Sequence, residues 1–279
     1  MASPSKSGSF VSQLRSPLSP AVGTVLTLAS PMIARVTATS AADFVMIDAE
    51  HAPLSFDQVT QMVHGYMTAP TASTKHALIR IPSRDVAWVK WALDSGCSGI
   101  VVPMVNTVTD MRTVLDHALY PPKGRRSFGP IYAPFASRGD GSATYGAAND
   151  YFQRARQGEI AIIPMIESKE GLDNCHEILS LEGVDGVFIG PADLRLALGL
   201  EPGLDGDEPE FVAALHRITK AAKMHGKVVG CMGIGEATAC KRTLEGMDFL
   251  LSTFDFGALV GGYAADLARA QSGIAKARL

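Results

Sequence analysis

Two acidic residues that suit a metal ion follow neighbouring apolar runs of the sequence. Glu167 ends the run AIIPMIE, and Asp193 lies in GPADL after the run GVFI, at a spacing of about one strand–helix unit of a parallel barrel. Two carboxylates without an adjacent Cys or His suit a hard divalent cation such as Mg²⁺ or Mn²⁺, with water and substrate completing its coordination. Spacing leaves another interpretation equally open, in which Asp193 caps a helix and Glu167 pairs with a surface lysine.

A second polar group ends the apolar stretch DFVMIDAEH, residues 43–51. His51 is the best candidate for a general base because the ordinary pKa of imidazole lies near neutral pH. Asp48 or Asp94 could orient its ring, and Glu50 could contact a bound metal ion through water. The alternative is a structural histidine, which is the more common role of an isolated histidine after a strand.

Arg80 ends another apolar run, in the segment ALIRIP. A guanidinium that leaves a core strand needs an anionic partner, because an unpaired buried charge is costly. It could bind a substrate carboxylate or an enolate oxygen through two parallel hydrogen bonds. The alternative is a structural salt bridge to Asp48 or Glu50, and we favour the functional role.

Two further segments could bind an anion. The turn GRRS, with Arg125 and Arg126, could close over an anionic substrate as part of a lid, although a solvated charged loop is equally consistent with it. GPADL offers backbone N–H groups at a helix start, which favour a carboxylate, so we include Gly190 and Ala192, with Pro191 between them, among the substrate-binding candidates.

Eight short apolar runs, separated by helical patterns, must position these side chains. Continuous apolar runs of this kind are typical of parallel strands buried on both faces, and eight strands alternating with helices predict a TIM (β/α)8 barrel. An open doubly wound sheet is the alternative, disfavoured because no glycine-rich turn follows the first run. The runs cover residues 23–28, 43–48, 77–81, 99–105, 161–167, 186–190, 227–233 and 247–253.

Helical patterns cover residues 55–67, 84–96, 107–119, 169–181, 209–226 and 235–246. We expect a flexible N-terminal tail over residues 1–20 and one barrel domain over residues 21–279, with a long loop at 120–146. Catalytic groups of such barrels lie at the carboxyl ends of the strands, and Asp48, Glu50, His51, Arg80, Glu167 and Asp193 all end or follow a predicted strand.

Composition excludes several classes of function. The 279 residues carry a formal net charge of −3, so a nucleic-acid partner is not expected, and no apolar run approaches the roughly 20 residues of a membrane span. The four cysteines lack CxxC spacing, which argues against a zinc site, and suit a reducing, cytoplasmic setting in which all four are buried.

Taken together, the segments DFVMIDAEH, ALIRIP, GIVVPMV, GRRS, PMIES and GVFIGPADL resemble the HpcH/HpaI aldolase family, the class II pyruvate aldolases, from about residue 20 to 265. Each motif is weak alone, but their order and spacing are specific. The N-terminal segment SPLSPAVGTVLTLASPMIARV is more similar to a fungal branch, the macrophomate synthases, than to bacterial members.

The resemblance implies a divalent metal, most simply Mg²⁺ with Mn²⁺ or Co²⁺ as alternatives, and a pyruvate enolate intermediate. It assigns Glu167 and Asp193 to the metal, Arg80 to the enolate oxygen, and His51 to proton transfer, with Asp48 in the same motif. It implies no organic cofactor. It also implies a hexamer built from dimers, in which a C-terminal helix, here within YAADLARAQSGIAKARL, is swapped between subunits.

One position departs from the bacterial pattern. Met165 stands two residues before Glu167, where bacterial members of the family usually have Gln. Loss of this amide would change the polar contacts around a bound oxo acid, and it puts the bacterial substrate range in doubt more than the metal site.

Two activities follow from this interpretation. The first is metal-dependent aldol cleavage of 4-hydroxy-2-oxo acids, and the alternative is decarboxylation of oxaloacetate whose enolate then adds to an acceptor such as a 2-pyrone. A non-catalytic binding or assembly protein that kept the fold is a third hypothesis, against which the complete set of candidate residues argues. Fold alone decides none of these.

Overall fold

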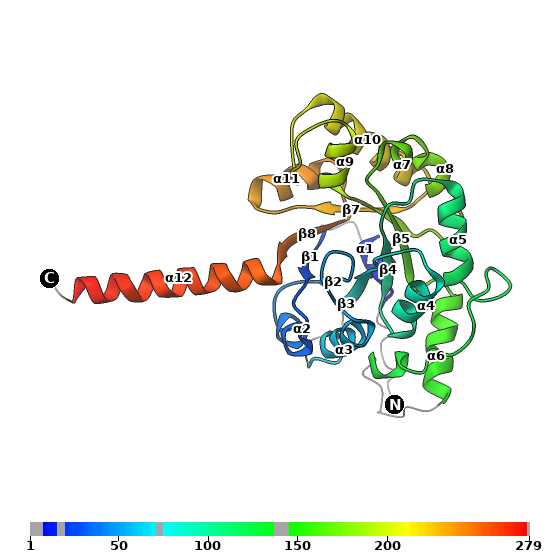
Figure 1. Cartoon of the computed structure of the whole chain (residues 1–279), viewed down its shortest axis with the longest axis horizontal. Coiled ribbons are helices and arrows are strands. Elements are labelled where there is room, and N and C mark those ends of the chain that lie inside the picture. The colour runs from blue at the N-terminus through cyan, green and yellow to red at the C-terminus, as the bar shows by residue number, and fades with distance from the viewer. Residues whose placement is uncertain (1–7, 16–19, 71–74, 137–144, 278–279) are drawn as a thin grey trace.

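The computed structural model describes residues 8–15, 20–70, 75–136 and 145–277, and its centre is a closed barrel of eight parallel strands in sequence order (Figure 1). The predicted TIM barrel is thereby confirmed, and the open sheet is excluded because β1 pairs with β8. The strands are β1 (Ala21–Leu26), β2 (Phe44–Asp48), β3 (His76–Arg80), β4 (Gly99–Val102), β5 (Ala161–Ile166), β6 (Gly186–Ile189), β7 (Val228–Met232) and β8 (Phe249–Phe254).

Helices surround the barrel, and most begin and end within two residues of the predicted patterns. These are α3 (Phe56–Met67), α4 (Val86–Asp94), α5 (Val108–Ala118), α10 (Pro209–Met224) and α11 (Glu236–Leu244). The pattern at 169–181 instead forms two short helices, α7 (Lys169–Asp173) and α8 (Cys175–Leu179), because Asn174 leaves helical geometry between them. The sequence patterns did not predict α2 (Pro31–Thr37) and α6 (Tyr145–Arg156), whereas α9 (Pro191–Ala197) begins at the helix start expected in GPADL.

Side chains that alternate along the strands fill the barrel interior. Phe44 and Met46 of β2 belong to an inner cluster, whereas Val45 and Ile47 face the surrounding helices. This period of two is the geometry of an extended strand. Large rings are accommodated by glycine on neighbouring strands: a side chain at Gly23 would lie 2.6 Å from the Phe44 ring.

A short N-terminal helix, α1 (Phe10–Leu14), closes the barrel at the amino ends of its strands. Phe10 is buried, with its ring 5.2 Å from that of Phe44 and 5.5 Å from that of Phe249. The expectation of a flexible tail therefore fails over residues 8–15, because these apolar side chains cover the inner cluster. The rest of the expected tail, apart from residue 20, lies outside the described residues.

Other segments also differ from their expected structure. Of the loop expected at 120–146, residues 137–144 lie outside the described part, and a 3-10 helix, η1 (Ala133–Ala136), precedes it. Cys240 is exposed on α11, so the prediction of four buried cysteines is wrong at this position. Within the described residues, no helix has both the length and the apolar character needed to cross a membrane.

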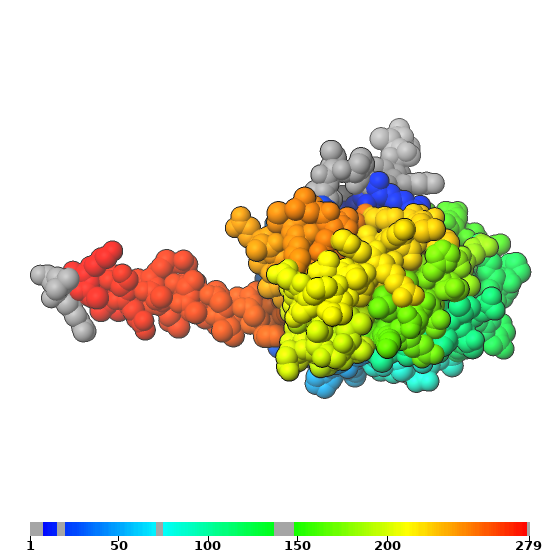
Figure 2. Space-filling model, turned by 90° about the horizontal axis from the view of Figure 1, so that it is seen from above, coloured from blue at the N-terminus to red at the C-terminus, as the bar shows by residue number. Residues whose placement is uncertain are grey.

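The C-terminal helix α12 (Asp255–Lys276) projects away from the barrel (Figure 1). Figure 2 shows it extending from the side of the barrel, with no other described segment along most of its length. Of its 22 residues only Asp255 is buried, while Val260, Tyr263 and Leu267 are more than 60% exposed.

Candidate active site

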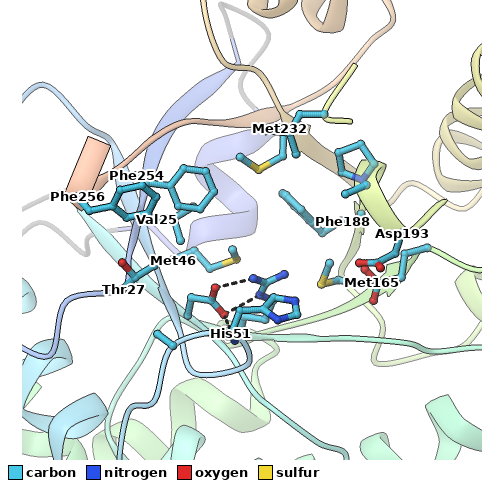
Figure 3. A pocket seen from close by; sticks show the side chains of 18 of the residues that line it. Val25, Thr27, Met46, His51, Met165, Phe188, Asp193, Met232, Phe254 and Phe256 are labelled. Carbon is cyan, nitrogen blue, oxygen red and sulfur yellow. Dashed lines mark hydrogen bonds and ion pairs between the residues drawn. The ribbon is translucent and has the colours of Figure 1, made fainter. Parts of the chain in front are cut away.

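A pocket of about 470 Å³ opens at the carboxyl ends of the strands (Figure 3). Its size falls within the range of roughly 300–1,000 Å³ that is usual for small-molecule sites. It collects side chains from seven strands or the segments that follow them. The lining residues are Val25, Thr27, Met46, Asp48, His51, Ala52, Pro53, Arg80, Met165, Glu167, Phe188, Gly190, Pro191, Ala192, Asp193, Leu204, Met232, Phe254 and Phe256.

The alternation of the strands explains why the polar groups face this pocket. Asp48 continues the inward-facing series of Phe44 and Met46, and Glu167 continues that of Met165. Residues two apart on a strand share a face, so each polar side chain follows the last apolar layer of the interior. A charged group placed one position earlier or later would face the surrounding helices.

Asp48 and Arg80 form a two-point ion pair at the end of β2 and β3. Arg80 donates from Nε to Oδ1 at 2.9 Å and from Nη2 to Oδ2 at 2.6 Å, and its Nη1 lies 3.2 Å from Oε2 of Glu50. Burial of Asp48 opposes ionisation, but the hydrogen bonds and charge of Arg80 outweigh it and hold the pKa of Asp48 below its ordinary value. The pair is therefore ionised and rigid at neutral pH.

Glu167 follows β5 and lies deep in the pocket, only 4% exposed. Its Oε1 accepts a 2.7 Å hydrogen bond from the backbone N–H of Met104, and its Oε2 lies against Gly190. Burial, reinforced by the nearby charges of Glu50 and Asp193, raises the pKa of Glu167 to about 7. The pocket thus holds more negative charge than the single guanidinium of Arg80 neutralises.

This excess of carboxylates fits a divalent cation. Glu167 and Asp193 come from adjacent parallel strands, β5 and β6, and both line the pocket. They offer only oxygen ligands, which hard cations such as Mg²⁺ prefer. No group of three or more His, Cys, Asp or Glu side chains in the described ranges is arranged to hold an ion. The protein would therefore supply two ligands and leave positions for water and substrate.

His51 lies in the turn after β2 and also lines the pocket. Its side chain is 64% exposed, and its Nε2 lies 3.6 Å from Oε2 of Glu50. Asp48 does not contact the ring, but its Oδ1 accepts hydrogen bonds from the backbone N–H groups of Glu50 and His51, at 3.1 and 3.3 Å. Asp48 therefore holds the turn that carries His51, while Glu50 is the carboxylate beside the imidazole.

Four of the sequence candidates are not lining residues: Glu50, which contacts Arg80 and His51 at the edge of the site, and Asp94, Arg125 and Arg126, which lie away from it. Asp94 does not reach His51, because it forms a buried ion pair with Arg126, 2.6 Å from Oδ1 to Nη2. Arg126 also lies over the ring of Tyr120, at 4.6 Å. Arg125 is exposed and pairs with Asp116. The GRRS turn is thus anchored to the outer helices, which does not support the expected lid.

Several lining residues were not anticipated. Phe254 and Phe256 flank the start of α12, and Leu204 lies in the segment between α9 and α10. They are apolar, and a search for chemically reactive side chains overlooks such residues. Met104, whose N–H binds Glu167, adopts a positive φ of 51°, a conformation that no sequence pattern indicates for methionine.

Comparison with known proteins places the chain among enzymes with this architecture. Residues 22–257 match the family model described as HpcH/HpaI aldolase/citrate lyase. The chain is 35% identical over 240 residues to a hydroxypyruvate/pyruvate aldolase of Rhizorhabdus wittichii, covering 86% of this chain and 90% of that protein. It is also 35% identical to a 5-keto-4-deoxy-D-glucarate aldolase of Klebsiella pneumoniae, covering 85% and 86%.

Solved structures of two related proteins superimpose on most of this chain. A family protein from Burkholderia cenocepacia superimposes with a TM-score of 0.79 at 28% identity, covering 94% of this chain and 98% of that one. Macrophomate synthase superimposes with a TM-score of 0.78 at 27% identity, covering 95% and 90%. The protein therefore belongs to the HpcH/HpaI aldolase/citrate lyase family and is an enzyme of the aldolase type.

Proposed function

We propose that the protein is a divalent-metal-dependent carbon–carbon lyase that cleaves 4-hydroxy-2-oxo acids through a pyruvate enolate. The observation that carries this proposal is the convergence of Arg80, Glu167 and Asp193 on one pocket. Two carboxylates suit Mg²⁺, with Mn²⁺ or Co²⁺ as alternatives, and the guanidinium beside them suits a developing oxyanion. The names of the aldolase relatives support the same class of substrate.

The protein residues would act on a substrate held by its carboxylate and 2-oxo group. A divalent ion held by Glu167 and Asp193 would act as a Lewis acid toward that 2-oxo group. Arg80, kept in place by Asp48, would stabilise negative charge on the enolate oxygen. His51 would take the proton of the 4-hydroxyl group, with Oε2 of Glu50 lying 3.6 Å from its Nε2.

A second activity, decarboxylation of oxaloacetate, is favoured by Met165 and by the likeness to macrophomate synthase. Decarboxylation produces the same enolate but needs no base to begin, so the arrangement of Arg80, Glu167 and Asp193 serves both reactions. Met165 gives the pocket an apolar side chain at the position where the family resemblance implies an amide in bacterial members.

Pyruvate release by the purified protein tests the proposal. We would supply 4-hydroxy-2-oxo acids with an acidic and with an uncharged C4 substituent, and oxaloacetate, in parallel, with Mg²⁺, then with EDTA, then with Mg²⁺ restored. Metal-dependent release from either hydroxy acid supports the aldolase, and release from oxaloacetate alone supports the decarboxylase. No metal-dependent release from any of them would show that Glu167 and Asp193 do not hold a catalytic metal ion.

Variants separate the residue roles. Glu167→Ala and Asp193→Ala should abolish both activities, while Glu177→Ala, an exposed carboxylate on α8, should leave them unchanged. His51→Ala should lower aldol cleavage by about 10²- to 10⁴-fold, the usual contribution of a general base, and decarboxylation much less. Equal losses in the two reactions would exclude His51 as the base.

We also propose that the protein is a homo-oligomer, a hexamer of paired subunits with α12 exchanged between partners. The support is the exposed apolar surface of α12, together with the family to which the chain belongs. A patch of this kind on a projecting helix is typical of a protein–protein contact.

A further inference from the structure

The pocket is divided between a charged side and an apolar wall. The lining residues that carry charge or can acquire it are Asp48, His51, Arg80, Glu167 and Asp193. Phe254 and Phe256 lie across the pocket from Asp193, with Met232 between the two sides (Figure 3). Leu204 also lines the pocket. We call Leu204, Met232, Phe254 and Phe256 the apolar wall.

A buried carboxylate holds the aromatic part of this wall in place. Asp255 accepts hydrogen bonds at 2.8 Å from the backbone N–H groups of Thr27 and Leu28 and from the Thr27 hydroxyl. It thereby ties the start of α12 to the end of β1, and the Phe254 and Phe256 rings on either side of it lie 5.4 Å apart. The Thr27 hydroxyl donates its hydrogen bond to Asp255, so it is not available to donate to a ligand.

Ion pairs also anchor the segment that carries Leu204. The next residue, Asp205, pairs with Lys241 at 3.3 Å and with the fully buried Arg242, both from α11. On the other side of the segment, Arg195 makes two hydrogen bonds to Glu208, at 2.6 and 2.7 Å. Leu204, 38% exposed, is thus presented to the pocket by a segment held at both ends.

The apolar wall suits an apolar group, and none of its four side chains can neutralise a charged group. Among the lining residues Arg80 is the one arginine or lysine, and it is already paired with Asp48 and Glu50. A second carboxylate or a phosphate at the far end of a substrate would therefore lose water without gaining a partner. An aryl or branched alkyl group would bury apolar surface against two aromatic rings and Leu204.

We propose that the apolar wall is the subsite for the aldehyde half of the substrate, and that this half is an aryl or branched alkyl aldehyde rather than a hydroxylated or acidic one. The inference rests on the proposed lyase function. In cleavage, the bond between C3 and C4 breaks and its electron pair passes to the enolate of pyruvate. The 4-hydroxyl loses its proton, C4 leaves as the aldehyde carbon, and the enolate takes up a proton at C3. The C4 substituent therefore contacts the wall throughout.

The volume of the pocket agrees with this assignment. At about 470 Å³ it is large for pyruvate alone, which would occupy only the charged side. The space beyond that side is bounded by the wall, which includes Phe256, a residue that is 51% exposed overall. Binding of an apolar group would remove part of this exposed surface from water.

Cleavage of two substrates that differ only at C4 tests the proposal. One carries a phenyl group and the other a hydroxymethyl group, and kcat/KM is measured from pyruvate release with Mg²⁺. We expect the phenyl substrate to be preferred by about tenfold or more, the scale of discrimination available to an apolar pocket. Exchange of the pyruvate methyl protons in D₂O, which needs no aldehyde, reports enolate formation separately.

Phe256→Ser and Leu204→Ser should each reduce the preference for phenyl severalfold while proton exchange stays within twofold of the unaltered protein. Phe256→Leu should keep most of the preference. Leu196→Ser, exposed on α9 and outside the pocket, is the matched control and should change neither quantity. Tyr263→Ser, on the face of α12 proposed for assembly, separates an effect of assembly from an effect of the pocket.

The outcomes distinguish failure of the proposed apolar subsite from failure of the proposed lyase function. Proton exchange with a preference for the hydroxymethyl substrate, or a preference that the wall variants leave unchanged, would overturn the apolar subsite and leave the lyase function standing. Absence of both exchange and cleavage would overturn the lyase function, and the subsite with it. A loss of preference shared by Tyr263→Ser and accompanied by subunit dissociation would assign Phe256 to assembly instead, and would also overturn the subsite.

Discussion

At the scale of single residues, the candidate site depends on close approaches that only glycine allows. A side chain at Gly190 would place its Cβ 2.2 Å from Oε2 of Glu167. Gly190 has an ordinary negative φ, so its backbone would tolerate another residue. The absence of a side chain is therefore needed for the position of the Glu167 carboxylate.

Gly190→Ala should displace Glu167 and lower pyruvate release and Mg²⁺ affinity by about 10- to 100-fold, the usual effect of disturbing the support of a metal ligand. Its unfolding temperature should change little, since the residue ends a strand at the open mouth. Titration with Mn²⁺, followed by electron paramagnetic resonance, measures the affinity. Gly129→Ala, where a Cβ would meet nothing within 4 Å, is the control. Unchanged affinity in Gly190→Ala would show that Glu167 is not a ligand.

At the scale of elements, α1 and β3 together seal the barrel end opposite the pocket. His76 begins β3 and is buried, with Nε2 2.8 Å from Oε1 of Gln13 and Nδ1 3.2 Å from Oγ of Ser98. Its ring lies 5.5 Å from that of Phe10. Burial, with a smaller repulsion from Arg154, lowers the pKa of His76 to about 4.

This depressed pKa predicts that acid lowers the free energy of unfolding through His76, at the barrel end closed by α1. Between pH of about 6.5 and 4 the unfolded chain takes up a proton at His76 that the folded chain does not, so stability falls as pH falls through that window. The shift corresponds to at most about 3 kcal/mol. Urea unfolding at several pH values should show a smaller acid loss for His76→Gln than for the unaltered protein, and His216→Gln, on an exposed site, should follow the unaltered protein. If the free energy of unfolding fell equally with falling pH in all three proteins, the prediction would be contradicted.

At the scale of the whole molecule, α12 carries apolar surface that the barrel does not cover. Val260, Tyr263, Leu267 and Ile274 are all more than half exposed and recur at spacings that place them on one face of the helix. A helix of 22 residues is about 33 Å long at 1.5 Å per residue, enough to cross a second subunit. This geometry supports the proposed exchange of α12 between partners.

Replacing Val260, Tyr263 and Leu267 together by serine should lower the molar mass in solution to that of a smaller assembly or a monomer. The reason is that this face of α12 would no longer bury apolar surface against a partner subunit. Size-exclusion chromatography with light scattering measures the mass. A control with Asp266→Ser and Arg269→Ser removes an exposed ion pair from the same helix and should keep the native mass. A monomeric unaltered protein would rule out the proposed assembly.

The sequence was sufficient to predict the barrel, because eight apolar runs separated by helical patterns have few other ways to bury both faces of their strands. It also predicted that Asp48, Arg80, Glu167 and Asp193 would meet, since the ends of parallel strands share one edge. The catalytic and metal-binding roles of these residues stay predictions. The long segment before α6 and the helix within residues 8–15 carried weaker patterns, and there the expectations were incomplete or failed.

What the sequence determined by itself is thus the order of the strands and the set of polar groups at their ends, because both follow from local periodicity. Only the tertiary structure decided which partner each group takes. Asp94 pairs with Arg126 rather than with His51, the N–H of Met104 reaches Glu167, and Phe256 enters the pocket from a helix that follows the last strand. These contacts join residues far apart in the chain, and their geometry depends on how the whole barrel closes rather than on any short segment.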